Sequence, residues 1–328
     1  ILSSIASVSA VALGFGGYLQ AITGVPALFF AIALIIAMSA VNFIGIEESV
    51  AANIVLTIIE VAGIAIIIIL GAEFLGTVDY LETPTGVGGI VSAVGVIFFA
   101  FVGFEGLVKI GEETKEPTKT IPRALILSLV ISTALYVAAA ISVVSVVPYQ
   151  DLVGSSSALA DVAAAAAGPE MGVAMSMIAL ISTANTVLIL SIATSRIAYG
   201  MSKRSALPEF LSRVHSRGKT PHFAILTSTV LAILLCTIGN IEFVANVANY
   251  TIFIVFLAVD TALLILWRKK AVKGGWFALA GAMGVTSALA MLTQFDLAVT
   301  ALSLAVTGLG VLAYRFISPH LRSGPARM

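Results

Sequence analysis

The stretch VAANIVLTIIEVAGIAIIIILG, residues 50–71, decides the class of fold because it is long and almost entirely apolar. A helix that crosses a bilayer needs about 20 consecutive, mostly apolar residues, and Glu60 is the single charged residue in this stretch. The whole chain has the same character, since 59% of its 328 residues are hydrophobic and 10% are charged, whereas soluble domains carry about 25% charged residues. The composition therefore predicts an all-α integral membrane protein.

Ten stretches satisfy this criterion of length and hydropathy, and turn or breaker residues such as Gly24, Pro84 and Pro148 separate them. The predicted crossings are 1–22, 27–44, 50–71, 89–111, 121–147, 171–200, 222–239, 243–267, 275–292 and 297–314. Between the fifth and the sixth, the sequence SSSALADVAAAAAGPE (155–170) predicts a further helix that is too short to cross. We expect this short helix to lie on the outer surface.

The basic residues give the orientation in the membrane. If the crossings alternate, all 17 Lys and Arg lie in or beside the segments near 112–120, 201–221, 268–274 and 315–328, which then share one side. Loops rich in Lys and Arg stay in the cytoplasm. The sequence therefore predicts a multi-pass protein of the cell (plasma) membrane with a cytoplasmic C-terminus.

Three acidic residues fall deep within predicted crossings: Glu60 in the third, Glu105 in the fourth and Asp260 in the eighth. Ionisable side chains are costly to bury in a bilayer, so each is a candidate for function. The alternative is that each is hydrogen-bonded to a neighbouring helix or reaches a water-filled crevice without moving a proton. Asn185, in the sixth crossing, is a further side chain that could face a polar site.

The fourth crossing is the least regular. Its sequence, GGIVSAVGVIFFAFVGFEGLVKIGEE (88–113), carries Gly95, Gly103, Gly106 and Gly111 inside the apolar stretch. Glycine weakens a helix and permits unwinding, and transporters use unwound helices at mid-membrane to bind substrates. Glycines also allow helices to pack closely, which is the alternative explanation.

Three segments carry a resemblance to a known family. They are FFAFVGFEGLVKIGEETKEPTKTIPRALILSLVISTALYV (98–137), NFIGIEESVAANIVLTIIEVAGIAIIIILG (42–71) and SRIAYGMSKRSALPEFLSRVHSRGKTPHFAIL (195–226). The chain thereby resembles permeases of the amino acid-polyamine-organocation (APC) superfamily, especially its cationic amino-acid transporter and prokaryotic branches. Members have twelve helices, so the ten crossings are expected to correspond to the third through twelfth, with the first two helices missing.

The resemblance implies an inverted-repeat (5+5) transporter fold followed by two C-terminal helices. Residues 1–71 would hold helices three to five of the first repeat. Residues 72–267 would hold the second repeat, helices six to ten. Residues 268–328 would hold the two C-terminal helices and a cytoplasmic tail.

The resemblance also implies roles for individual residues. The unwound residues would offer backbone carbonyls to a substrate ammonium, and they are Phe99, Ala100, Phe101, Val102 and Gly103. Phe99 matches an aromatic gate that closes over the substrate in relatives. Glu105 matches an acidic position linked to proton coupling, and Glu60 falls where some relatives place a lysine that replaces a sodium ion. An acid at that position departs from the family pattern, although a Glu that takes up and releases a proton would still serve coupling.

The function expected from these features is secondary active transport of an amino acid or related amine by alternating access. Coupling to protons is favoured over sodium, with symport and exchange both open. The alternatives are a non-transporting amino-acid sensor and a passive channel or facilitator. An intramembrane enzyme is disfavoured because the deep spans lack His and the acids have no partner motif. We expect no cofactor, no bound metal and no nucleic-acid partner.

Overall fold

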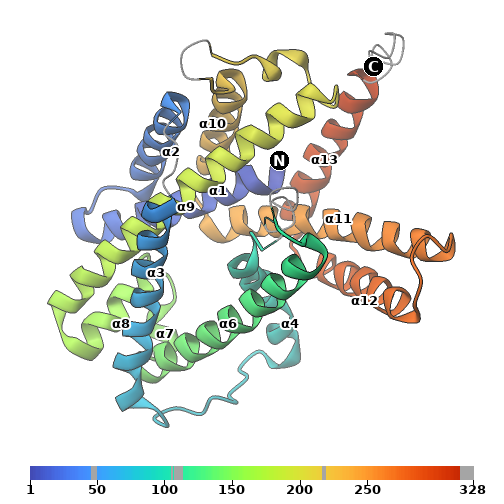
Figure 1. The fold of residues 1–328 in the computed structure, drawn as a ribbon. Helices are drawn as coiled ribbons and strands as arrows, with labels where there is room; N and C mark the ends of the chain where they lie inside the picture. Colours follow the sequence, from blue (N-terminus) through green and yellow to red (C-terminus); the bar gives the residue numbers. More distant parts are fainter. Residues whose placement is uncertain (46–49, 105, 107–113, 216–218, 318–328) are drawn as a thin grey trace.

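The computed structural model describes residues 1–328 except 46–49, 105, 107–113, 216–218 and 318–328, and within this part it contains helices and no strands (Figure 1). The long helices are α1 (Leu2–Thr23), α2 (Ala27–Ile44), α3 (Val50–Gly71), α6 (Pro117–Val146), α9 (Pro169–Lys203), α11 (Ile241–Arg268), α12 (Gly275–Leu292) and α13 (Leu297–Ile317). The shorter ones are η1 (Ala72–Phe74), α4 (Gly86–Ile97), η2 (Phe98–Phe101), α7 (Tyr149–Leu152), α8 (Ala158–Ala167), η4 (Glu209–Ser212) and α10 (His222–Cys236).

Each predicted crossing overlaps a helix, but the helices differ in length. Among the described residues, seven helices are long and apolar enough to cross a membrane: α1, α2, α3, α6, α9, α11 and α12. In the other three predicted crossings the apolar helical segments are shorter: Gly86–Phe101 (α4 with η2), His222–Cys236 (α10) and Leu297–Leu312, which is the greater part of α13. The all-helical class is confirmed, and the count of ten crossings stays a prediction.

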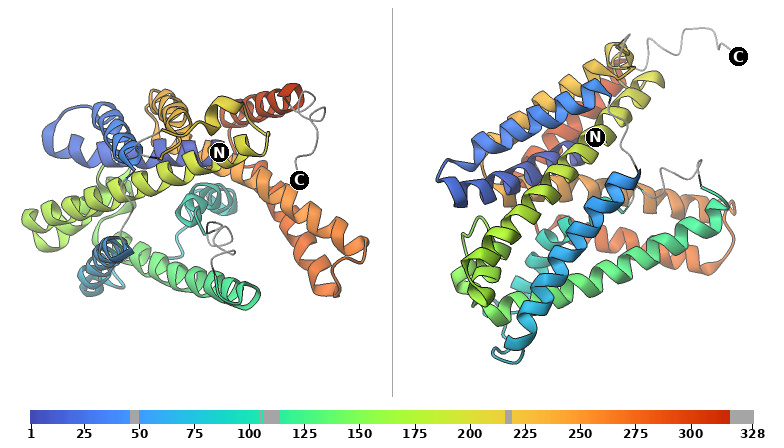
Figure 2. Two further views of the ribbon diagram at one scale, coloured as in Figure 1. Left: turned by 45° about the horizontal axis from the view of Figure 1, so that its top comes forward. Right: turned by 60° about the vertical axis from the view of Figure 1, so that its left-hand side comes forward.

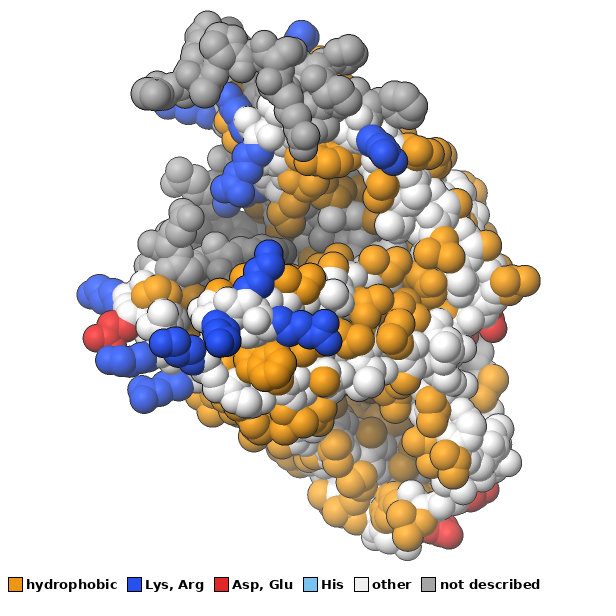
Figure 3. All heavy atoms as spheres, turned by 90° about the vertical axis from the view of Figure 1, so that its right-hand side faces the viewer, with side chains coloured by type: hydrophobic (Ala, Val, Ile, Leu, Met, Phe, Trp, Pro, Cys, Tyr) orange, Lys and Arg blue, Asp and Glu red, His pale blue; other side chains and the backbone are white. Residues whose placement is uncertain are grey.

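Large apolar side chains cover the outside of the bundle, as Figure 3 shows for one face. Phe29, Ile69 and Ile126 are 64–69% exposed. Exposure of such a large apolar surface to water is unfavourable, whereas the hydrocarbon core of a bilayer solvates it. The exposed surface therefore fits a protein embedded in lipid.

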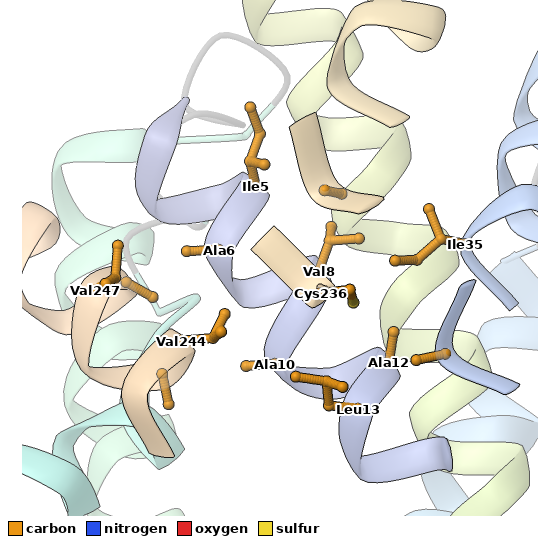
Figure 4. Close-up of a cluster of buried hydrophobic side chains, with 14 of the residues drawn as sticks. Ile5, Ala6, Val8, Ala10, Ala12, Leu13, Ile35, Cys236, Val244 and Val247 are labelled. Atoms are coloured by element: carbon orange, nitrogen blue, oxygen red, sulfur yellow. The ribbon is translucent and has the colours of Figure 1, made fainter. Parts of the chain in front are cut away.

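Helix α1 lies at the centre of the fold, where it packs against α2, α9, α10 and α11. Its small side chains permit this close approach, as Ala6, Ala10 and Ser9 are completely buried. Ser9 Oγ donates a hydrogen bond to the backbone carbonyl of Ala232 on α10, at 2.9 Å. Figure 4 shows Ala6 and Ala10 on the side of α1 that faces α11, with Val244 beside them.

A second group of helices consists of α3, α6 and α8, which contact one another beside α9. Gly71 ends α3 where it meets α6, and a Cβ there would lie 2.7 Å from the Cα of Ser142. The absence of a side chain is therefore what lets the two helices approach.

The short helix predicted between the fifth and sixth crossings is α8, which has 10 residues and is too short to span a bilayer. One side of it is buried, through Ala160, Val162 and Ala163, where it packs on α9 and α3. Helices α11 and α12 form an antiparallel pair that extends away from the rest of the bundle (Figure 2).

Candidate functional site

The predicted break in the fourth crossing is present in the backbone. Helix α4 has 12 residues and ends at Ile97, so it rises only about 18 Å at 1.5 Å per residue, against a hydrocarbon core of about 30 Å. The chain continues as the 3₁₀ turn η2, becomes extended at Val102 (φ −63°, ψ 130°) and reverses at Gly103, where φ is +119°. Extended backbone cannot continue the regular i to i−4 bonds of the helix. Short-range bonds replace them here, from the N–H of Val102 to the carbonyl of Phe99 and from the N–H of Gly106 to the carbonyl of Gly103.

Helix α11 holds one side of this break. Asn249, which has no exposed surface, donates a hydrogen bond from Nδ2 to the carbonyl of Gly95, at 2.8 Å. The ring of Phe98 packs against the rings of Phe253 and Phe256, and its centroid lies 4.5 Å from that of Phe253 and 6.1 Å from that of Phe256. The last turn of α4 is therefore anchored by one polar contact and an aromatic cluster.

Helix α6 holds the other side. The hydroxyl of Tyr136 donates to the carbonyl of Ala100 at 2.9 Å, and its ring meets that of Phe101 edge to face, with centroids 5.3 Å apart. Phe99 turns toward the main core and packs against the buried cluster around α1. The five residues predicted to bind substrate thus occupy the break between α11 and α6, and their role in binding stays a prediction.

Of the two deep acids that the structure describes, Glu60 is the one with a hydrogen bond to another side chain. It is partly buried on α3, and its Oε1 accepts a hydrogen bond from Nδ2 of Asn185 on α9, at 3.4 Å. Glu105 lies outside the described residues. Asp260 lies on α11 against α12, where Gly284 leaves room for its carboxylate.

Sequence reasoning missed the two side chains that hold the break, Asn249 and Tyr136. Asn249 begins a sequon, Asn-Tyr-Thr, but a sequon inside a crossing is not accessible for glycosylation. A polar amide within an apolar span was the available signal, because such a group needs a hydrogen-bond partner in the membrane. Among the described residues, no group of three or more His, Cys, Asp or Glu could hold a metal ion.

Comparison with known proteins defines the class. Residues 1–319 match the profile of the amino acid permease family, and the chain belongs to that family. The family lies within the APC superfamily, so the resemblance is confirmed, and this is a multi-pass membrane protein of a transporter family rather than an enzyme.

Individual relatives show the range of the family. The chain is 26% identical to the branched-chain amino acid permease BcaP of Bacillus subtilis over 82% of this chain and 63% of that protein. It is 28% identical to the methylthioribose transporter of the same organism over 82% of this chain and 62% of that one. It is 27% identical to cationic amino acid transporter 1 of Arabidopsis thaliana over 70% of this chain and 39% of that one. The chain thus spans less than two thirds of the length of these three curated relatives.

Proposed function

We propose that this protein is a secondary active transporter that moves an amino acid across the cell membrane by alternating access around the break in α4. The interruption at Val102 and Gly103, held between α11 and α6, is the observation that carries the proposal. Family membership supports it, because the named relatives include amino acid transporters. The inverted repeat relating helices within 1–71 to those within 72–267, and a cytoplasmic C-terminus, belong to the same proposal.

The substrate ammonium is the group that the break suits best. A helix carries partial negative charge at its carboxyl end, and α4 with η2 ends at Phe101, directly before the break. Transporters bind cationic groups with backbone carbonyls at such helix ends. The backbone from Phe99 to Gly103 therefore recognises an ammonium in this proposal, and the ring of Phe99 serves as a gate.

In this proposal Glu60 is the residue that couples transport to protons. Glu105 is a second coupling residue, which the resemblance to the family suggests. When its carboxylate is charged, Glu60 accepts the amide hydrogen bond from Asn185. Once protonated, the same group can donate instead, which changes the preferred contact between α3 and α9. A proton on Glu60 thereby alters the packing of two long helices, which is the kind of two-state element that alternating access needs.

The test is uptake of labelled amino acids into liposomes that contain the protein, with branched-chain and cationic amino acids as the first panel. An inward proton gradient should accelerate uptake, and an imposed sodium gradient at constant pH should not. Glu60→Gln should abolish this acceleration while counterflow persists. Glu73→Gln is the matched control, because Glu73 is exposed just beyond the end of α3. Full gradient dependence in Glu60→Gln would remove the role proposed for Glu60.

The same preparation separates the alternative functions. A sensor would bind amino acids without flux, and a passive channel would show uptake that neither saturates nor supports counterflow. Methylthioribose belongs in the panel because one relative is named for its transport. Saturable uptake of methylthioribose in the absence of any amino acid uptake would contradict the proposed substrate class.

A further inference from the structure

The turn between α11 and α12 carries a dense group of cations. Arg268, Lys269, Lys270 and Lys273 lie within six residues, and the sequence from 261 to 295 contains no Asp or Glu. All four side chains are exposed. In the part of the chain that the structure describes, none of them forms an ion pair. This positive charge is therefore not neutralised by its own segment.

Three of these cations line an open hollow at the surface. The hollow has a volume of about 520 Å³ and is lined by Trp267, Arg268, Lys270, Val272, Lys273 and Gly274. Helix α12 begins immediately afterwards at Gly275, so the positive end of an 18-residue helix adds to the charge of the side chains.

The hollow lies at the boundary between apolar and charged surface. Trp267 lines it and Trp276 follows its last lining residue, Gly274, by two positions. They are the two tryptophans of the chain, with exposures of 38% and 72%. Tryptophan is enriched at the level of lipid headgroups. Exposed apolar side chains follow along α12, including Phe277 and Leu279. Figure 3 shows Lys and Arg side chains gathered on this side of the molecule beside apolar surface.

We propose that this hollow binds the phosphate-bearing headgroup of an anionic phospholipid. Arg268, Lys270 and Lys273 would donate hydrogen bonds to the phosphate oxygens, while the acyl chains lie along the exposed apolar side of α12. A lipid fits better than a soluble phosphate compound because the cations and the apolar surface adjoin one another. The site is separate from the break in α4 and does not depend on the proposed transport function.

The two tryptophans provide the assay. The 328-residue chain is reconstituted in vesicles in which phosphatidylglycerol or phosphatidylcholine carries brominated acyl chains, which quench tryptophan at contact. Competition between the two lipids gives their relative binding constant at this site. We expect phosphatidylglycerol to be preferred, by about fivefold for each cation that engages the headgroup. The variant Arg268→Gln/Lys270→Gln/Lys273→Gln should reduce the preference to about one.

A matched control distinguishes a built site from a diffuse positive potential. Lys203→Gln/Arg204→Gln/Arg213→Gln removes the same charge from another exposed basic segment and should keep the preference. An equal loss in both variants, with circular dichroism confirming that both are folded, would overturn the proposal. Equal quenching by the two lipids in the unmodified chain would overturn it as well. Displacement of brominated phosphatidylglycerol by millimolar inorganic phosphate would assign the site to a soluble anion instead.

Discussion

Replacing Gly103 by alanine is expected to strain the backbone of the break without creating steric overlap with surrounding residues. A Cβ at this position meets no atom of the described residues within 4 Å, so the change introduces no overlap with them. Its cost is conformational, because φ is +119° and a non-glycine residue held in such a region costs about 1–3 kcal/mol. Alanine also restricts the unfolded chain, which offsets about 0.4–1 kcal/mol. The net destabilisation of this backbone conformation is then about 1–2 kcal/mol.

The assay is saturation of amino acid uptake in liposomes at equal amounts of reconstituted protein. If the substrate binds the backbone in this conformation, the half-saturating concentration should rise roughly 5- to 30-fold, since 1.4 kcal/mol corresponds to a factor of ten. Gly106→Ala is the control, because its Cβ also meets no atom of the described residues within 4 Å and residue 106 has helical backbone. Equal half-saturating concentrations for Gly103→Ala and Gly106→Ala would refute the reasoning.

Three further substitutions test the contacts that surround the break and the helix packing. Asn249→Leu removes a buried interhelical hydrogen bond. It should lower the free energy of unfolding, measured by titration with a denaturing detergent, by about 0.6–1.7 kcal/mol. An unchanged free energy of unfolding would mean that this hydrogen bond does not hold α4. Tyr136→Phe removes the hydroxyl that donates a hydrogen bond to the backbone at the break but keeps the ring. The half-saturating concentration of uptake should therefore change, while the melting temperature should not. A changed melting temperature with an unchanged half-saturating concentration would contradict this role. Gly71→Ala places a Cβ against the backbone of α6 and should destabilise by about 1–3 kcal/mol. Gly200→Ala, whose Cβ meets no atom within 4 Å in the described part of the chain, should be neutral or stabilise by about 0.5–1 kcal/mol. Equal effects of the two alanines would contradict the close packing at the end of α3.

The helical segments were predictable because hydropathy acts over long windows. Every predicted crossing overlaps a helix. For the first two crossings, the observed helix ends lie within about two residues of the predicted ends. Length was less predictable: α10 has 15 residues, although the apolar stretch that predicts it extends to Gly239. Helix α10 ends at Cys236 and the following residues form a turn, with Gly239 at positive φ, and hydropathy does not detect such backbone reversals.

The site was only partly predictable for a related reason. The glycines in 88–113 indicated a break, because the tendency to unwind is local. Its supports come from helices far away in the sequence, as Asn249 is 154 residues from Gly95. Glu60 and Asn185 were each noticed as polar groups in apolar spans, but 125 residues separate them, and no local pattern shows that they meet. Tyr136 gave no signal at all, since a tyrosine in an apolar helix is common.

The most direct test of the central claim is protection of the break by substrate. Ala100→Cys places a thiol at an exposed position within the break, and the native Cys236 is completely buried, so its background reaction should be small. The account predicts that a saturating concentration of the transported amino acid slows alkylation of the new thiol, and that its α-keto analogue, which lacks the ammonium, does not. Ser92→Cys, exposed earlier on α4, should react at the same rate throughout. Unchanged alkylation at position 100 while amino acid uptake persists would contradict the claim that the break binds the substrate.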